Sequence, residues 1–61
     1  MPVVTVKWLE GRTKEQRKEI AKGIVDLFVS AAKVRPEDMH VVFEDMPRSH
    51  WAKGYKFFDE S

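Results

Sequence analysis

Hydrophobic and polar positions first alternate along the chain and then recur at helical spacing. In residues 3–9, β-branched and aromatic side chains predominate, which predicts a strand. Alternation along that strand places Val4, Val6 and Trp8 on one face and the remaining side chains on the other. Because both faces carry apolar side chains, we expect both to be covered. Gly11 then ends the strand in a connecting turn.

A helix is predicted to begin at Thr13. Thr13 and Gln16 have the spacing of a capping box, in which each side chain satisfies a backbone N–H group at the helix start. Apolar residues then recur at intervals of three and four, which predicts one buried stripe made of Ile20, Ile24, Leu27, Phe28 and Ala31. Pro36 closes the helical region, because the residue before a proline is disfavoured in the helical conformation.

Lysines recur every four residues elsewhere on this helix, at Lys14, Lys18 and Lys22, with two glutamates close by. Such a pattern is typical of a solvated helix face, and less often of a basic patch that binds a partner. The interpretation as a solvated face is therefore preferred.

A second strand is predicted over residues 39–46, which are again rich in apolar and β-branched side chains. A strand, a helix and a strand form a β-α-β unit, whose strands should be parallel and whose crossover should be right-handed. The tail, residues 47–61, shows neither helical nor strand periodicity. It carries four aromatic residues: Trp51, Tyr55, Phe57 and Phe58. This unit cannot bury all four, so we expect a short C-terminal hairpin that contacts another subunit. The predicted fold class is a small, oligomeric α/β fold.

Length and composition favour oligomerisation. The chain has 61 residues, enough for one domain over residues 1–61, and no cysteine. A monomer of this size buries only ~60% of the surface of its unfolded chain, so its stability is marginal. Without cysteine, disulfides and thiolate metal sites are excluded. The two histidines, His40 and His50, are too far apart for a compact metal motif, so association between copies is the remaining source of stability.

Charge and hydropathy narrow the expected partners. The net charge is +1, which is not the clustered basic excess of a nucleic-acid-binding protein. No apolar run approaches the ~20 residues of a membrane span, and the first residues lack the pattern of a signal peptide. We therefore expect a cytoplasmic protein with neither nucleic acid nor membrane as a partner.

Several short motifs follow one another along the chain. They are Met1-Pro2 directly before a strand, Leu9-Glu10-Gly11-Arg12 directly before the helix, and Glu44-Asp45-Met46 followed by His50-Trp51. As a set, and with this chain length, they resemble the 4-oxalocrotonate tautomerase family from Pro2 to about Trp51. The resemblance implies a β-α-β tautomerase fold assembled as a homohexamer, a trimer of dimers, that needs no cofactor or metal.

The resemblance also implies roles for individual residues. Removal of Met1 would make Pro2 an N-terminal secondary amine that acts as the general base. Arg12, supplied by a neighbouring subunit, would bind a carboxylate of a small substrate, which suits the planar fork of a guanidinium group. Leu9 and Trp51 would contact the substrate and keep the site apolar. The implied reaction interconverts enol and keto forms of a 2-hydroxydienoate or a 2-oxo acid.

His40 departs from the family pattern, because characteristic members carry an arginine at this position. An imidazole is ordinarily neutral above pH ~6.5, so a second permanent cation for the substrate is missing. His40 is either a substrate-binding residue or a structural strand residue, and Arg48 or Lys53 could supply the charge instead. Two alternatives stay open: a non-catalytic oligomeric module that keeps Met1, and one subunit of a hetero-oligomeric tautomerase.

Overall fold

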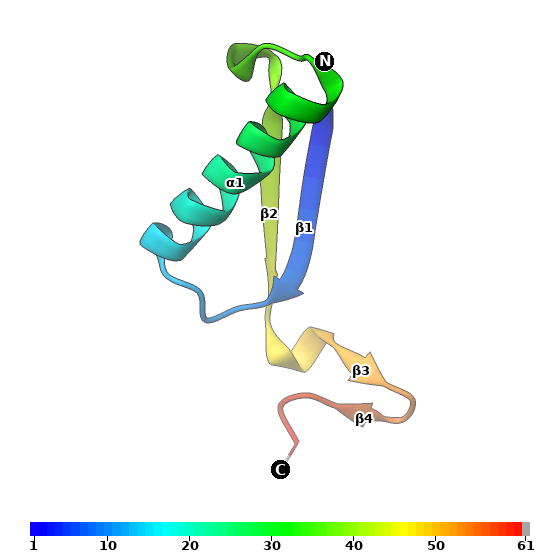
Figure 1. Cartoon of the computed structure of the whole chain (residues 1–61). Helices are drawn as coiled ribbons and strands as arrows, with labels where there is room; N and C mark the ends of the chain where they lie inside the picture. Colours follow the sequence, from blue (N-terminus) through cyan, green and yellow to red (C-terminus); the bar gives the residue numbers. More distant parts are fainter. Residues whose placement is uncertain (61) are drawn as a thin grey trace.

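The computed structural model describes residues 1–60 and contains one long helix, a parallel pair of strands and a small C-terminal hairpin (Figure 1). The elements are β1 (Val3–Leu9), α1 (Lys14–Ala32), the short 3₁₀ helix η1 (Pro36–Asp38), β2 (His40–Met46), a second 3₁₀ helix η2 (Arg48–His50), β3 (Ala52–Lys53) and β4 (Lys56–Phe57). The predicted β-α-β order is confirmed, as are the parallel strands and the hairpin.

Strands β1 and β2 pair along their whole length, from Val3 opposite His40 to Leu9 opposite Met46. Helix α1 lies across one face of this pair (Figure 1), and the side chains of β1 on that face are partly buried. The opposite face stays open, since Val3 is 60% and Val42 is 45% exposed. The expectation that both faces are covered is therefore wrong for a single chain.

The start of α1 confirms the predicted capping box. The backbone N–H of Gln16 donates to the Thr13 hydroxyl at 3.1 Å, and the backbone N–H of Thr13 donates to the Gln16 side-chain oxygen at 2.9 Å. At the other end the chain leaves the helix through Lys33, whose φ of 59° is left-handed. Local interactions thus cap the start of α1, and near its end Lys33 Nζ donates to the Ser30 carbonyl at 3.1 Å.

The predicted apolar stripe on α1 is correct in part. Ile24 and Phe28 face the sheet, but Leu27 is 62% exposed and Ile20 and Ala31 are also exposed. Ala21, Val25 and Val29, on the adjacent side of the helix, are partly buried instead. The apolar surface of α1 is wider than two strands can cover, and the docking angle of the helix decides which part is buried.

The lysines of the exposed helix face behave as solvated side chains. Lys22 Nζ lies 2.8 Å from Asp26 Oδ2, one turn further along the helix. This hydrogen bond raises the pKa of Lys22. The interpretation as a solvated face, and not a partner-binding patch, accords with this pairing.

The C-terminal hairpin turns at Gly54, whose φ of 66° suits a glycine. Its Phe58 returns to Trp51: the backbone N–H of Phe58 donates to the Trp51 carbonyl at 2.9 Å, and the two ring centroids are 6.1 Å apart. Tyr55, at the tip, is fully exposed, and Phe57 is also exposed. As expected, this chain alone does not bury its aromatic tail.

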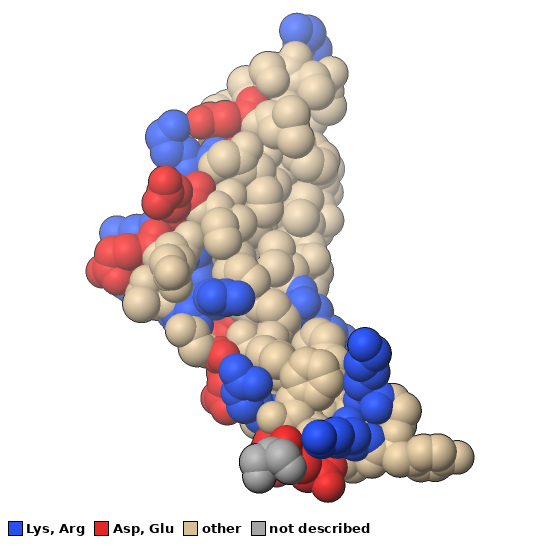
Figure 2. Space-filling model, turned by 60° about the horizontal axis from the view of Figure 1, so that its bottom comes forward, with Lys and Arg blue, Asp and Glu red and all other residues tan. Residues whose placement is uncertain are grey.

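The described chain has no fully buried residue, and its shape is elongated. Its surface area of 4935 Å² exceeds the roughly 4,100 Å² of a typical folded monomer of this mass. The excess, about 800 Å², equals what one partner contributes to a standard protein interface. In Figure 2, most charged side chains lie along the left edge and toward the C-terminal end, and the upper right of the view is largely uncharged.

Candidate functional site

Pro2 and His40 lie together at the start of the two strands. The backbone N–H of His40 donates to the Pro2 carbonyl at 3.1 Å, which extends the parallel ladder by one step. Pro2 is partly buried and His40 is exposed, whereas Met1 is 84% exposed. A proline is tolerated at this position because it precedes the strand, where the ladder needs no backbone N–H donor.

Leu9, Arg12 and Trp51 belong to the opposite end of the sheet. Leu9 pairs with Met46, and the backbone N–H of Glu10 donates to the Met46 carbonyl at 3.0 Å. The chain then turns at Gly11, whose φ of 123° is accessible to glycine and strained for other residues. This turn carries Arg12 back along the strand, so that its guanidinium carbon lies 5.5 Å from the centre of the Trp8 ring.

Trp51 lines a surface hollow of about 270 Å³ just beyond the end of β2. The other residues of this hollow are Lys7, Met46, His50 and Ala52. Lys7 is a cation that the sequence did not single out, and its Nζ atom lies 3.4 Å from Glu44 Oε2. The suggested substitute cations, Arg48 and Lys53, lie in η2 and β3, and so follow the same end of β2.

The predicted site residues therefore form two groups, one at each end of the sheet (Figure 1). Leu9 lies six positions after Val3 along the strand, which corresponds to about 20 Å at the usual rise of a strand. Pro2 and Arg12 cannot act on one small substrate within a single chain.

Arg12 is held by residues that the sequence analysis did not identify. Trp8 Nε1 donates to Asp45 Oδ1 at 2.5 Å, and Arg17 Nη1 lies 3.2 Å from Asp45 Oδ2. Arg17 Nη1 also donates to the Arg12 carbonyl at 2.8 Å. The sequence contained one usable signal, because Trp8 and Asp45 occupy paired positions once the strand register is known.

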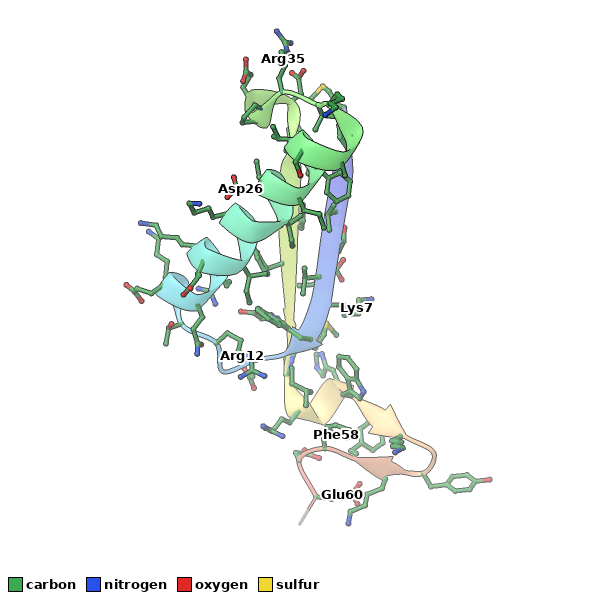
Figure 3. All side chains as sticks on the ribbon, viewed as in Figure 1. Lys7, Arg12, Asp26, Arg35, Phe58 and Glu60 are labelled. Carbon is green, nitrogen blue, oxygen red and sulfur yellow. The ribbon has the colours of Figure 1, made fainter. Side chains whose placement is uncertain are left out.

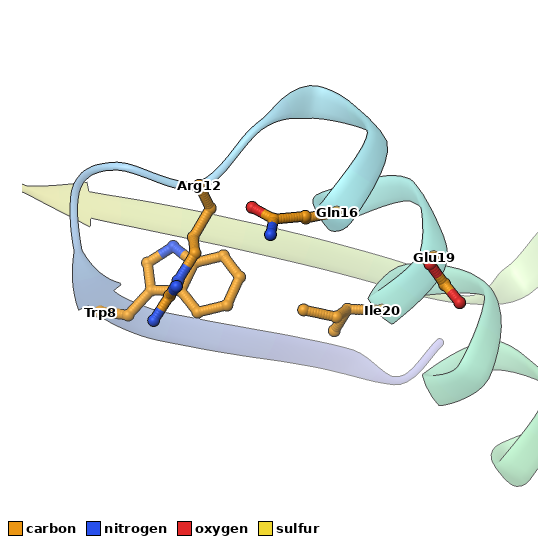
Figure 4. Close-up of a pocket in the computed structure, with 5 residues that line it drawn as sticks. All are labelled: Trp8, Arg12, Gln16, Glu19 and Ile20. Atoms are coloured by element: carbon orange, nitrogen blue, oxygen red, sulfur yellow. The ribbon is translucent and has the colours of Figure 1, made fainter.

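Arg12 also lines a surface hollow of about 320 Å³ between the end of β1 and the start of α1. Figure 4 shows Arg12 stacked over the Trp8 ring, with Gln16, Glu19 and Ile20 completing the lining. Figure 3 places Arg12 at the end of the sheet nearest the hairpin. Within the described residues no carboxylate forms an ion pair with Arg12, so its guanidinium group is available to an anionic ligand.

Neither a metal-binding cluster nor a membrane-spanning helix is present among residues 1–60. Over residues 1–60, His, Asp and Glu side chains form no group of three that could hold a metal ion. The only long helix in that range, α1, does not combine the length and apolar character of a membrane span.

Comparisons with known proteins agree on one family. The family model described as tautomerase enzyme matches residues 2–59. A "Probable tautomerase" from Bacillus cereus is 49% identical over 57 residues, which cover 92% of each chain. The crystal structure of YwhB, a homologue of 4-oxalocrotonate tautomerase, is 32% identical with a TM-score of 0.88, and the match covers 98% of both chains.

A further solved structure concerns assembly as well as fold. A heterohexamer 4-oxalocrotonate tautomerase from Chloroflexus aurantiacus is 27% identical to this chain with a TM-score of 0.86. The match covers 98% of this chain and 97% of the other.

Proposed function

Because this chain belongs to the tautomerase family, we propose that it is a cofactor-independent tautomerase whose general base is the amine of Pro2. The observation that carries the proposal is the family match, which begins at Pro2 itself and continues to residue 59. Its substrate is a small 2-hydroxydienoate or an enolised 2-oxo acid. The reaction moves a proton from the enol hydroxyl, or from an activated carbon, to a more distant carbon.

Pro2 becomes a base only after Met1 is removed, because an amide nitrogen has no useful basicity. The 84% exposure of Met1 leaves the Met1–Pro2 bond accessible to processing. A free α-amino group titrates near pH ~8, and an apolar, cationic surrounding penalises its charged form. A neutral secondary amine near pH 7 can accept the substrate proton and return it, so one group serves both steps.

Arg12 anchors the substrate carboxylate in this proposal. Its guanidinium group is unpaired among residues 1–60 and lines a hollow whose other walls are Trp8, Ile20, Gln16 and Glu19. Where water is excluded, the ion pair between Arg12 and the substrate carboxylate becomes stronger, because the effective dielectric constant falls. Leu9 and Trp51 supply apolar surface at the same end of the sheet.

Assembly completes the site. The two groups of residues lie about 20 Å apart in one chain, and the open sheet face and aromatic tail leave surface for other copies. We propose a homohexamer, a trimer of dimers, in which Pro2 of one copy meets Arg12 of another. The heterohexamer from Chloroflexus aurantiacus makes a mixed assembly the alternative composition.

The proposal is tested by mass spectrometry of the native protein together with a turnover assay on phenylenolpyruvate and a 2-hydroxydienoate. We expect a chain without Met1 that turns over at least one of them in the presence of a chelator. Retained Met1 without turnover would instead indicate a non-catalytic oligomeric module. A processed chain that becomes active only with a second, related chain would indicate a hetero-oligomer.

His40 is proposed to lie beside the base and to set the choice between monoacid and diacid substrates. Replacing it, as His40→Arg, should raise the diacid-to-monoacid ratio of kcat/KM by about 10- to 150-fold at pH 7.5, since a charge-assisted hydrogen bond contributes ~1.5–3 kcal/mol.

The matched control is His40→Gln, which keeps a polar side chain and adds no cation. Its ratio should stay close to that of the unmodified protein. A ratio that is indifferent to His40→Arg would make His40 a structural strand residue, with the second cation supplied elsewhere.

A further inference from the structure

We propose that Trp8, Asp45 and Arg17 are positioning residues that hold Arg12 ready for its anionic ligand. The inference rests on the proposed function only in taking that ligand to be a substrate carboxylate. The holding itself is argued from contacts within this chain.

The Trp8 ring is fixed before Arg12 contacts it. On the sheet it stacks against Phe43, with ring centroids 5.4 Å apart and an angle of 27° between the planes. Its indole N–H donates to Asp45 Oδ1, which removes rotation of the ring. A cation over an indole face gains more than over the other aromatic rings, and the guanidinium carbon of Arg12 lies 5.5 Å from this ring's centre.

Arg17 holds both Asp45 and the backbone of Arg12. Its Nη1 atom pairs with Asp45 Oδ2 at 3.2 Å and donates to the Arg12 carbonyl at 2.8 Å. Both side chains of the pair are only about one-third exposed, at 31% for Arg17 and 35% for Asp45.

The pairing has a consequence for charge as well as for position. Asp45 is the carboxylate that fixes Trp8, and Arg17 already neutralises it. Asp45 therefore does not capture Arg12 in an ion pair that a substrate would have to break. Arg12 is held by its backbone and by a π face, and its guanidinium N–H groups have no ion-pair partner among residues 1–60, so they can bind an anion.

Holding Arg12 in this way should increase the affinity for the ligand. A side chain that is ordered before binding loses less conformational entropy when the ligand arrives. Arg12 would bind the carboxylate equally well in the substrate and in the transition state. Removing the contacts that position Arg12 should therefore raise KM and leave kcat nearly unchanged.

The first test is independent of activity and uses NMR of the native assembly. In the unmodified protein, the δ protons of Arg12 should be shifted upfield by the Trp8 ring. Asp45→Ala should move the Trp8 indole N–H signal and reduce that upfield shift. Asp26→Ala removes a carboxylate of another ion pair, on the exposed side of α1, and should change neither signal.

If Asp45→Ala does not fold, Trp8→Phe provides the same test, because it keeps an aromatic face and removes the N–H donor. The Trp8 indole signal is absent from this variant because the indole has been removed. The readout is therefore the smaller upfield shift of Arg12. An Arg12 shift that is missing in the unmodified protein, or unchanged in these variants, would overturn the inference.

The second test is kinetic, with phenylenolpyruvate and its methyl ester as substrates. Trp8→Leu should raise KM for the acid about 2- to 30-fold, the range of cation–π contributions, while kcat changes less than about 2-fold. The ester, which lacks the anionic group, should show no such change. In an Arg12→Ala background, Trp8→Leu should add nothing further, as expected for residues that act through one contact.

A loss of similar size for acid and ester, or an undiminished effect in the Arg12→Ala background, would show a merely structural role for Trp8. The two hypotheses fail separately. Absence of enol turnover in the unmodified, processed protein would refute the proposed function and leave the NMR result to stand alone. Normal turnover with an unshifted Arg12 would refute only the positioning role.

Discussion

Replacing Pro2 with alanine is expected to lower kcat for enol tautomerisation by about 10²- to 10⁴-fold, the usual contribution of a positioned general base. The physical reason is that the reacting amine would change from the constrained secondary amine of proline to a mobile primary amine. The backbone carbonyl that accepts from His40 remains, so the ladder at the start of β1 should survive the change. Steady-state kinetics on phenylenolpyruvate, with sedimentation to confirm assembly, measures the effect.

Two further variants serve as controls for this experiment. Inserting one residue between Met1 and Pro2 converts the proline nitrogen into an amide, so we expect activity to disappear although Pro2 is present. Pro36→Ala removes an exposed proline at the start of η1 and should retain activity. Full activity in Pro2→Ala or in the chain with the insertion would exclude Pro2 as the base.

Two impaired variants are expected to restore activity when they assemble together. Arg12→Ala should lower kcat/KM about 10- to 150-fold by removing a charge-assisted anchor. If each site combines Pro2 of one copy with Arg12 of another, refolding Pro2→Ala and Arg12→Ala chains in equal amounts leaves about one quarter of the sites with both groups. We therefore expect roughly a quarter of the unmodified kcat/KM, measured at substrate concentrations well below KM. This follows from the strand geometry, which keeps the two groups about 20 Å apart in any single chain.

The control for this mixture is Pro2→Ala refolded with the double variant Pro2→Ala, Arg12→Ala, which cannot form a complete site. Sedimentation should report particles near 43 kDa in each case, the mass of six copies of a 7.2 kDa chain. Activity of the mixture that only matches the separate variants would contradict a site shared between copies. A stable folded monomer would contradict the assembly itself.

Much of the fold could be predicted because its signals are local. The capping box of Thr13 and Gln16 involves backbone groups within one turn, so its spacing in the sequence is enough to identify it. The alternation of residues 3–9 and the proline at position 36 likewise act on neighbouring residues. The order of a strand, a helix and a strand then restricts the strands to parallel pairing, which the structure confirms.

Other features depended on how distant segments meet. The sequence identified an apolar stripe on α1, but the docking of the helix decided that Ile24 would be covered and Leu27 exposed. Similarly, nothing in the sequence links Arg17 to Asp45, which are 28 positions apart, until α1 lies across β2.

The candidate site shows the same division most clearly. By itself, the sequence determined which residue types are present and that they resemble a tautomerase, because motifs are carried by residues close together in the chain. The predicted strand over residues 3–9 already separated Pro2 from Arg12. Only the tertiary structure decided that His40 lies beside Pro2. The physical reason is that this contact depends on the register in which β2 pairs with β1, and the two strands are far apart in the chain.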